Sequence, residues 1–414
     1  MKTRLFLSAV ALGLGLVVTL LLSLSRPASL ARADPGIYYV REGAAGDCHV
    51  VTTPCGSVQY AINLATTPGD EVWVATGTYT ENLVITRGIS LRGGWNVSFT
   101  VQAPATYPTT IDGRGGYVIS VTTGANPARV EGFTLRNGND GIHVESAVTT
   151  LVLTGNLVYS TTSQGIEVVS GTVWIEGNAI YSTTKEGIKV NAGNATVVRN
   201  VVHDVRGAGQ HGIRAQANSI VRGNQVYRIT GRGIDARGGT AVIADNLVYD
   251  TGDDGIRSDD TSTGVEVRGN TVYRAGNDGI DARGVTVLVA GNVVTGCTDN
   301  GIKSEGIGQW VRIEGNWVLS NATVGIAIRQ GPPPTPYRGQ GGGTNNVVGD
   351  QVSSSIELGG TGVGFVYHNT LVGSGVGTQG SGLAIASPLA ATIVNNVVVS
   401  HTTGITAVAG PRWS

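Results

Sequence analysis

The chain has 414 residues, with 63 Gly, 4 Phe and 1 Met, and a formal net charge of −1 at pH 7. It is rich in Val, Thr, Ile, Gly and Asn and has no long run of strong helix formers, so its composition favours strands and turns and excludes a mainly helical fold. The nearly neutral charge also excludes a protein that holds nucleic acid or an anionic membrane by bulk electrostatics.

The first 33 residues have the pattern of a secretory signal peptide. Lys2 and Arg4 precede an apolar run from Leu5 to Leu24, and Ala31-Arg32-Ala33 forms a small-residue cleavage site. An uncleaved membrane anchor is the alternative, because the apolar run is nearly long enough to span a bilayer. Cleavage removes four cations and changes the formal balance from 28 − 29 = −1 to 24 − 29 = −5. We therefore expect a mildly acidic, secreted protein, extracellular or at the cell surface, without a membrane contact after cleavage.

Residues 34–110 do not follow the repeat of the later chain, and we expect them to form an N-terminal cap and the first strands. Apolar residues at helical spacing predict a short helix that begins at Ser57, its N-cap, and ends near Ala65. This helix would cover the open first coil of the repeat. Cys48 and Cys55 are close enough in sequence to form a disulfide, which suits an exported protein, whereas Cys297 stands alone.

A repeat fills residues 111–414. Its units contain three short alternating stretches separated by turns, and each stretch is too short for a hairpin to close the pattern at this period. A coil of three strands, each paired in parallel with its copy about 4.8 Å away, satisfies the backbone. The sequence therefore predicts an all-β, single-domain parallel β-helix with three parallel sheets and coils of 22–24 residues. Two ladders carry this prediction: Asn156, Asn178, Asn200, Asn224, Asn246, Asn270, Asn292 and Asn316, and the Gly-Ile pairs led by Gly141, Gly165, Gly187, Gly212, Gly233, Gly255, Gly279, Gly301 and Gly325.

Each repeated residue type has a physical reason. Asn tolerates the left-handed backbone of a sharp turn, and its amide can bond the next amide along the stack. Gly allows a tight entry into the strand that follows it. A column of Tyr residues favours a structural stack of aromatic rings, and an exposed sugar-stacking strip is the alternative. The column consists of Tyr159, Tyr181, Tyr227, Tyr249 and Tyr273, with His203 substituting once.

The repeat is interrupted after Gly325. The Pro/Gly-rich segment 331–344 predicts a long loop that leaves the coil. Coils resume at Asn369, Asn396 and Gly404-Ile405, and we identify no C-terminal cap before Ser414.

The Asn and Gly-Ile ladders together resemble the right-handed parallel β-helix superfamily, the pectate-lyase-like fold. The resemblance covers most of the mature chain and implies that the Asn ladder lies between the second and third strands of each coil. It also implies that the Gly-Ile strand belongs to the first sheet, whose outer face carries the active cleft in the enzymes. That superfamily includes lyases, polygalacturonases, epimerases and adhesins, so the fold alone does not name a reaction. The outward residues of the Gly-Ile strands are His143, Glu167, Lys189, Arg214, Asp235, Arg257, Asp281, Lys303 and Ala327.

Three consecutive coils, at residues 252–260, 276–283 and 298–305, carry the most suggestive polar residues on this face. Stacking would bring their Asp and Asn side chains together, and clustered carboxylate and amide oxygens are the ligands that calcium prefers. Their Asp-Asp-Gly and Asn-Asp-Gly turns resemble metal-binding segments of some β-helical pectate lyases. The predicted calcium ligands are Asp254, Asp278, Asp281 and Asp299.

The neighbouring cations predict a reaction at an acidic sugar. Lys303 is the candidate base that removes the proton α to a uronate carboxylate, and Arg257 is the candidate group that steadies that carboxylate. Arg214, Asp235 and Arg283 are candidate substrate-binding residues.

A structural interpretation competes with the catalytic one. The outward column alternates in sign, and opposite charges on neighbouring strands can pair into a self-neutralising, solvated ladder. His143 and His211 flank Gly-Ile strands as candidate acids, although a lone His is more often a surface or turn residue.

We therefore predict a secreted monomer that acts on or binds an acidic polysaccharide or cell-surface glycan, as a calcium-dependent uronate lyase or epimerase. The first alternative is a non-catalytic extracellular repeat protein of the scaffold or adhesin type. The second is a glycoside hydrolase that uses Asp254 with Asp278 or Asp281. Nucleic acid is not an expected partner.

Overall fold

The computed structural model describes residues 35–146, 148–216, 218–306, 310–330, 340–351, 353–360, 362–373, 380–386 and 389–407. The predicted signal peptide and residues 331–339 of the predicted loop lie outside these residues. Gly36–Ser414 form one compact unit. No helix in the described part of the chain is long and apolar enough to cross a membrane.

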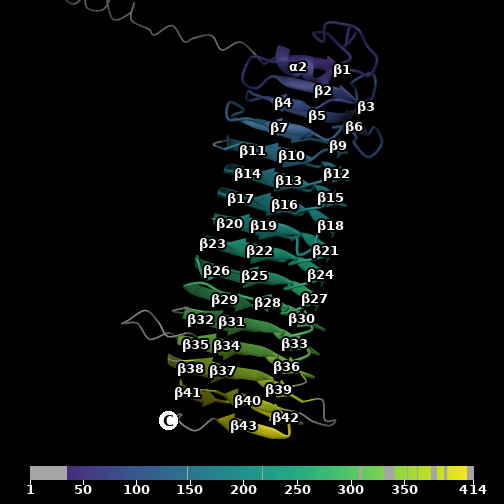
Figure 1. The fold of residues 1–414 in the computed structure, drawn as a ribbon. Helices are drawn as coiled ribbons and strands as arrows, with labels where there is room; N and C mark the ends of the chain where they lie inside the picture. The colour runs from purple at the N-terminus through teal and green to yellow at the C-terminus, as the bar shows by residue number, and fades with distance from the viewer. Residues whose placement is uncertain are drawn as a thin grey trace, which may run out of the picture. The chain divides into compact units, whose positions relative to one another are not determined.

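The unit Gly36–Ser414 is a parallel β-helix built from three sheets, as predicted (Figure 1). Sheet A contains β1 (Ile37–Val40), β2 (Glu71–Ala75), β5 (Ser90–Trp95), β8 (Ala128–Glu131), β11 (Val148–Thr154), β14 (Gly171–Glu176), β17 (Gly193–Val198), β20 (Asn218–Arg222), β23 (Gly239–Ala244), β26 (Ser262–Arg268), β29 (Thr286–Ala290), β32 (Trp310–Glu314), β35 (Gln340–Thr344), β38 (Gly362–Tyr367) and β41 (Leu389–Val394). Sheet B contains β3 (Gly77–Tyr79), β6 (Thr109–Asp112), β9 (Phe133–Arg136), β12 (Leu157–Tyr159), β15 (Ala179–Tyr181), β18 (Val201–Val205), β21 (Gln225–Ile229), β24 (Leu247–Thr251), β27 (Thr271–Ala275), β30 (Val293–Thr295), β33 (Trp317–Leu319), β36 (Val347–Gly349), β39 (Thr370–Val372) and β42 (Val397–Val399). Sheet C contains β4 (Leu83–Ile85), β7 (Ile119–Val121), β10 (Ile142–Val144), β13 (Ile166–Val168), β16 (Ile188–Val190), β19 (Ile213–Gln216), β22 (Ile234–Arg237), β25 (Ile256–Ser258), β28 (Ile280–Asp281), β31 (Ile302–Gly306), β34 (Ile326–Gln330), β37 (Ile356–Gly360), β40 (Ser381–Ile385) and β43 (Thr403–Ala407).

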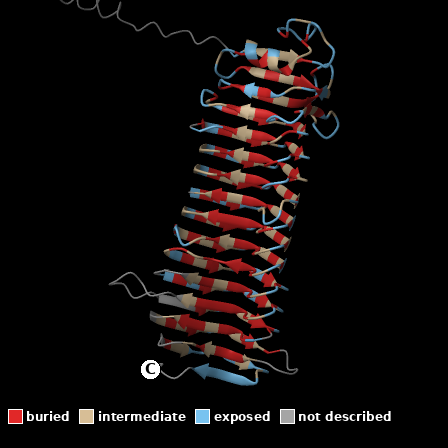
Figure 2. Cartoon of the chain, viewed as in Figure 1, coloured by how far each residue is buried: buried red, intermediate tan, exposed pale blue. Residues whose placement is uncertain are grey.

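The sheets pair each strand with its copy one coil away, in register. In sheet C, Ile188 lies opposite Ile166 on one side and Ile213 on the other, and all three side chains are fully buried. The alternation of the strand turns every second residue outward, so Lys189 is only partly buried. The inward side chains join into one hydrophobic core that runs from Val40 to Ala391 (Figure 2). That continuous core is the main stabilising element of the fold.

The Asn ladder lies between sheets A and B and forms the predicted chain of amide bonds. In a representative step, Asn178 Oδ1 accepts from the backbone N–H of Asn156 and from its Nδ2, both at 3.0 Å. Asn178 Nδ2 in turn donates to the carbonyl of Leu153 at 2.9 Å. The ladder also includes Asn346, which we did not predict.

The reason that we gave for Asn in this turn is wrong in one respect. The residue with positive φ is the one before each ladder asparagine, for example Gly155 at 61° or Asp245 at 56°. Asn is therefore required for its side-chain hydrogen bonds, and the left-handed backbone is supplied by the preceding residue.

The Gly-Ile glycines are required for close packing, which corrects our expectation of a backbone role. A Cβ on Gly233 would lie 2.4 Å from Val248 Cγ1 and 2.6 Å from the Gly255 carbonyl oxygen. Atoms do not approach so closely in folded proteins, so a side chain cannot be added without moving sheet B or the next coil.

The N-terminal segment follows the prediction in its helix but not in its boundary. Helix α2 (Val58–Leu64) has Ser57 as its N-cap, which accepts from the Tyr60 N–H, and it packs against β1, β2 and β4. A disulfide joins Cys48 to Cys55. Stacking begins at β1 instead of residue 111, because the first strands already belong to the three sheets.

The later coils differ from the prediction in one place. Gln340–Thr344, at the end of the segment that we predicted as a loop, is strand β35, and it pairs with β32 and β38. The last strand, β43, is exposed at every residue (Figure 2).

The Tyr column forms the predicted stack. Tyr227 and Tyr249 have ring centroids 4.9 Å apart at an interplanar angle of 3°, and His203 stacks on Tyr227 at 4.8 Å. Arg228 and Arg274 lie over rings of this stack. Neighbouring rings and guanidinium groups thus occupy the faces that a sugar would need.

Candidate functional site

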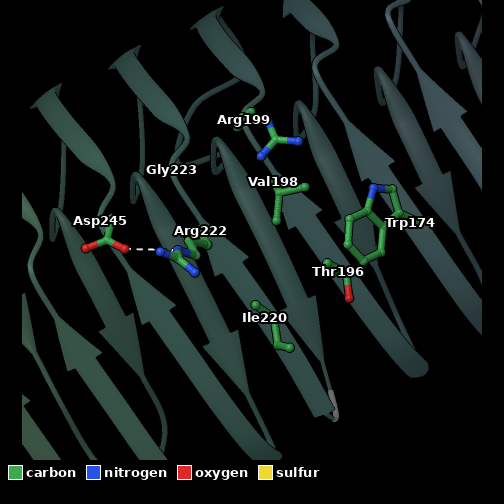
Figure 3. Close-up of a pocket in the computed structure, with 8 residues that line it drawn as sticks. All are labelled: Trp174, Thr196, Val198, Arg199, Ile220, Arg222, Gly223 and Asp245. Carbon is green, nitrogen blue, oxygen red and sulfur yellow. Dashed lines mark hydrogen bonds and ion pairs between the residues drawn. The ribbon is translucent and has the colours of Figure 1, made fainter.

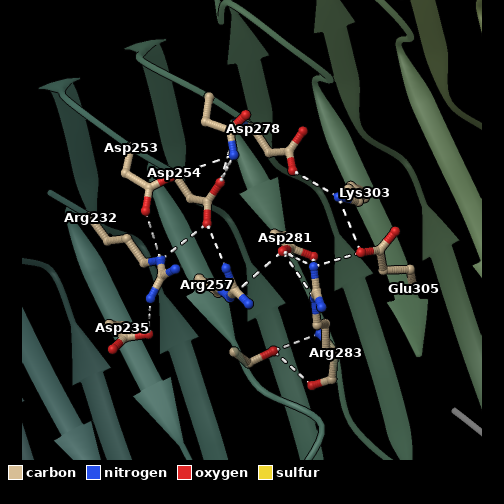
Figure 4. A network of polar contacts seen from close by, with 12 residues as sticks. Arg232, Asp235, Asp253, Asp254, Arg257, Asp278, Asp281, Arg283, Lys303 and Glu305 are labelled. Carbon is tan, nitrogen blue, oxygen red and sulfur yellow. Dashed lines mark hydrogen bonds and ion pairs between the residues drawn. The ribbon is translucent and has the colours of Figure 1, made fainter. Parts of the chain in front are cut away.

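The outer face of sheet C carries the predicted column of charged residues in the predicted register. Arg257 pairs with Asp235 on one side and Asp281 on the other, and Asp281 pairs with Lys303. The turns that precede these strands add a second row, in which Asp254, Asp278 and Asn300 stack on one another. Figure 4 shows Asp254 and Asp278 of the second row beside Arg257, Asp281 and Lys303 of the first.

Three carboxylates converge on this face. Asp254, Asp278 and Asp281 each offer an oxygen within 4.8 Å of the others, and all three residues are buried. Asparagines from the turns of the next coils hold two of these carboxylates. Asn277 Nδ2 donates to Asp254 Oδ1 at 2.8 Å, and Asn300 Nδ2 donates to Asp278 Oδ1 at 2.7 Å. These three residues form the acidic trio.

The acidic trio carries an unsatisfied oxygen. Asp278 Oδ2 is buried and has no hydrogen-bond partner among the residues that the structure describes. Burial raises the pKa of Asp278 to about 6, against the lowering effects of Asn300 and Lys303. Burial also raises the pKa of Asp254, helped by the charges of Asp253 and Asp281. A buried oxygen without a donor costs free energy unless a proton or a cation reaches it.

Cations surround the acidic trio at distances of 2.8–3.7 Å. Arg257 lies 3.5 Å from Asp254 and 3.7 Å from Asp281, and the ammonium of Lys303 lies 3.5 Å from Asp278 Oδ2. Burial lowers the pKa of Lys303, but the carboxylates of Asp278, Asp281 and Glu305 raise it more, so its pKa lies above the ordinary value. Lys303 is therefore a cation in this state, which is the opposite of what a base needs.

The other predicted site residues lie outside the acidic trio. Asp299 accepts from Thr323 and is not part of the converging group. Asp235 is buried and ion-paired with Arg214, Arg232 and Arg237, the last at 2.7 Å. Arg283 forms a bidentate contact with Asp281 and reaches Glu305 at 2.7 Å. Sequence reasoning missed Arg232, whose Nε lies 3.2 Å from Asp254 Oδ2.

A second polar cluster lies nearer the N-terminus on the same face. His143 Nδ1 is 3.1 Å from Asp140 Oδ2 and 3.3 Å from Glu167 Oε2. The hydrogen bond with Asp140 raises the pKa of His143 above its ordinary value, aided by Glu167 and Glu145. The sequence places His143 and Glu167 in the outward column, and we did not single out Asp140, although Asp140 precedes Gly141 as Asp254 precedes Gly255.

His211, the other candidate acid, is held by its neighbours. Its Nδ1 accepts from the Arg232 backbone N–H at 3.1 Å, and its Nε2 lies 3.6 Å from Asp235. Burial lowers its pKa, so it is mainly neutral near pH 7.

Sheet A carries a hollow of about 550 Å³ on its outer face (Figure 3). Thr196 stands between the larger Trp174 and Ile220 on neighbouring strands, which leaves the space. The pair Arg222–Asp245 closes one side at 2.9 Å. This hollow contains no cluster of acid and base groups, so the candidate reaction centre remains on sheet C.

Comparisons with known proteins agree with the fold. The family described as "right handed beta helix region" matches residues 87–244, 140–286, 204–337 and 241–412, which confirms the resemblance seen in the two ladders. No curated protein sequence matches the chain.

Several solved structures are similar to the chain at low identity and with TM-scores below 0.5. A pectate lyase, Pel9A, is 14% identical with a TM-score of 0.37, over 88% of this chain and 79% of that chain. The A-module of the mannuronan C-5 epimerase AlgE4 from Azotobacter vinelandii is 14% identical with a TM-score of 0.44, over 91% and 100%. The catalytic domain of a GH87 α-1,3-glucanase in complex with nigerose is 14% identical with a TM-score of 0.43, over 92% and 70%. Likenesses of this degree concern the fold alone.

Proposed function

The chain belongs to the right-handed β-helix family, and we propose that it binds and acts on an acidic polysaccharide along the outer face of sheet C, at the acidic trio. The observation that carries this proposal is the convergence of three buried carboxylates with one oxygen, Asp278 Oδ2, left without a hydrogen-bond partner among the described residues. The Lys303 ammonium lies 3.5 Å from this oxygen, too far for a strong hydrogen bond, so a bound cation or a proton would satisfy the oxygen better.

The acidic trio suits calcium as its cofactor. Asp254, Asp278 and Asp281 supply only hard oxygen ligands, and Asn300 adds an amide beside them. Calcium bound there would neutralise a uronate carboxylate and take up the charge that keeps Lys303 protonated. Asp299 is not included, because its side chain lies outside the group.

The cations of the face supply the binding of the polysaccharide. Arg257 is one-quarter exposed and lies between two carboxylates at 3.5 and 3.7 Å, distances too long for strong hydrogen bonds. Its guanidinium can therefore turn to a sugar carboxylate and bind it through two N–H groups. Lys303 lies on β31, two strands from Arg257, and would act as the base that removes the proton α to that carboxylate. The reaction class is β-elimination or epimerisation of a uronate.

The structure also favours the non-catalytic alternative at one point. Every carboxylate of the acidic trio has a cation within 4.0 Å, as a ladder of ion pairs requires. An inverting hydrolase fits less well, since the trio oxygens lie within 4.8 Å of one another and the carboxyl groups of inverting enzymes stand about 6.5–9.5 Å apart; the spacing is nearer to the roughly 5–5.5 Å of retaining enzymes.

The test is calcium-dependent release of unsaturated uronate, followed by ultraviolet absorbance, on pectate, alginate and related acidic glycans. Epimerisation on the same substrates is followed by proton NMR. The expected result is activity that chelation removes and that falls at least a hundredfold in Lys303→Ala and in Asp278→Asn. Arg312, a cation of sheet A whose side chain is 69% exposed, gives the control Arg312→Ala, which should retain activity. Calcium-dependent retention of a glycan without product would reduce the proposal to a binding protein. No binding and no product on any glycan would leave the scaffold alternative.

A further inference from the structure

The cluster around His143 is built differently from the acidic trio. It combines one imidazole nitrogen with two carboxylate oxygens, from Asp140 in the turn before β10 and from Glu167 on β13. The side chains of His143, Asp140 and Glu167 are 12%, 2% and 15% exposed, so one side of the cluster remains open to solvent.

Hydrogen bonding within the cluster explains only half of this geometry. In the neutral and in the protonated ring of His143 alike, Nδ1 carries at most one hydrogen, yet two carboxylate oxygens lie within 3.3 Å of it. If the Nδ1 hydrogen is donated to Asp140, no hydrogen remains on Nδ1 for Glu167 Oε2. The close approach of Glu167 Oε2 to Nδ1 is then not explained by a hydrogen bond between them.

Both carboxylates are held from behind. Asp140 Oδ1 accepts from the Gln164 N–H at 3.1 Å, and Glu167 Oε1 accepts from Lys189 Nζ at 2.9 Å and from Asn191 Nδ2 at 3.2 Å. These contacts hold the two carboxylates in place, and Asp140, His143 and Glu167 each offer a ligand atom within 4.8 Å of the others. The ring itself is fixed by Tyr117, which stacks on it at 4.0 Å with an interplanar angle of 2°.

We propose that His143 Nδ1, Asp140 Oδ2 and Glu167 Oε2 form a binding site for a divalent transition-metal ion of the zinc type, separate from the acidic trio. Tetrahedral zinc with bonds of about 2.0–2.1 Å places its ligand atoms about 3.3–3.4 Å apart. The two observed separations from Nδ1, 3.1 and 3.3 Å, match that spacing with little adjustment. The open side supplies the fourth position.

The donor set selects the class of metal. An imidazole nitrogen favours zinc, copper or nickel over calcium, which prefers oxygen ligands throughout. Two carboxylates balance the charge of a divalent ion. The contacts from Lys189, Asn191 and Gln164 are the outer hydrogen bonds that fix ligand orientation in metal sites. This inference does not depend on the function proposed for the acidic trio.

The test is a calorimetric titration of untagged, EDTA-treated full-length protein with Zn²⁺, together with the visible spectrum of the Co²⁺ form. We expect one zinc ion at micromolar affinity or tighter and the strong visible bands of tetrahedral cobalt. His143→Ala should weaken zinc at least a hundredfold and remove the cobalt bands. Glu167→Gln keeps the shape of the side chain and should weaken zinc at least tenfold, which keeps the test valid if His143→Ala folds poorly.

Two controls separate this site from others. His203 also has its Nδ1 beside a carboxylate, at 2.7 Å from Asp204, but only one carboxylate faces it, so His203→Ala should leave zinc affinity unchanged. Asp254→Asn tests binding of zinc at the acidic trio and should also leave it unchanged. Absence of zinc binding, equal affinity in His143→Ala, or loss in Asp254→Asn instead would overturn the proposal.

Discussion

The buried carboxyl of Asp278 provides a test of the site that needs no substrate. Its pKa of about 6 lies above the ordinary value of 3.8, because burial penalises the charged form. Between these two pH values the folded protein binds a proton that the unfolded chain has lost. Stability from this group is therefore complete below about pH 4 and is lost as the pH rises through about 6. The difference of 2.2 in pKa corresponds to about 3 kcal/mol at pH 7 and above.

Asp278→Asn replaces the carboxylate by a neutral amide that resembles the protonated acid. We expect the variant to match the wild type near pH 4 and to exceed it by up to about 3 kcal/mol at pH 7.5. Urea unfolding at half-unit steps from pH 4 to 8, in EDTA to exclude metal ions, measures the difference. Asn300 Nδ2 can still donate to Oδ1 of the new amide, so the turn is preserved.

Asp250 gives a control in which the shift of the pKa, and so the change in stability with pH, has the opposite sign. It is partly exposed, and the hydrogen bond from Arg274 lowers its pKa below the ordinary value. Asp250→Asn should therefore lower stability at neutral pH, and the loss should disappear as the pH falls through the folded pKa. A difference between Asp278→Asn and wild type that stays constant from pH 4 to 8 would refute the reasoning about Asp278, as would a variant less stable than wild type at pH 7.5.

Three further predictions concern the fold and are measured on purified protein. Gly233→Ala should lower the free energy of unfolding in urea by about 2–3 kcal/mol, because the added Cβ would lie 2.4 Å from a valine methyl. Gly264→Ala is the control: the atom nearest to its added Cβ is 3.7 Å away, so the free energy of unfolding should change by less than about 1 kcal/mol. Asn246→Ala should cost about 2–4 kcal/mol by breaking the buried amide ladder, and the exposed Asn218→Ala should cost less than about 1 kcal/mol; equal losses would contradict the ladder's role. Burial raises the pKa of the Cys297 thiol to about 11, so iodoacetamide at pH 8 should label this residue only after unfolding, and rapid labelling of folded protein would show that the core opens there.

The fold could be predicted from the sequence because its periodicity is carried by residues that cannot be replaced locally. Asn200 makes six hydrogen bonds through its backbone N–H and its side-chain amide, and a Cβ on Gly187 would meet a valine methyl at 2.3 Å, so both residue types recur in most coils. The physical roles of the repeated Asn and Gly residues were harder to predict, because both residue types are common in turns. The hydrogen bonds of Asn and the close packing around Gly appear only in the structure. Asn346 was missed because the segment before it breaks the spacing of the ladder.

The candidate site could be predicted only as far as register fixes it. The order Arg257, Asp281, Lys303 follows from the Gly-Ile repeat and was correct. The turns before these strands vary in conformation, so the sequence placed Asp299 with the calcium ligands although its side chain turns toward Thr323. Arg232 was missed because its contact with Asp254, one coil away, depends on the rotamer of a long side chain, which the repeat does not fix.

The partners of the buried acids differ along this face. Asp235 is ion-paired with Arg214, Arg232 and Arg237, the last at 2.7 Å, whereas the cation beside Asp278 among the described residues is Lys303 at 3.5 Å. Half-exposed ion pairs contribute about 0–1 kcal/mol each, whereas burying a carboxylate costs several kcal/mol. Asp235 is about as deeply buried as Asp278, but close ion pairs offset the cost of its burial. Asp278 is therefore the carboxylate on this face whose burial the proposed cation would best explain.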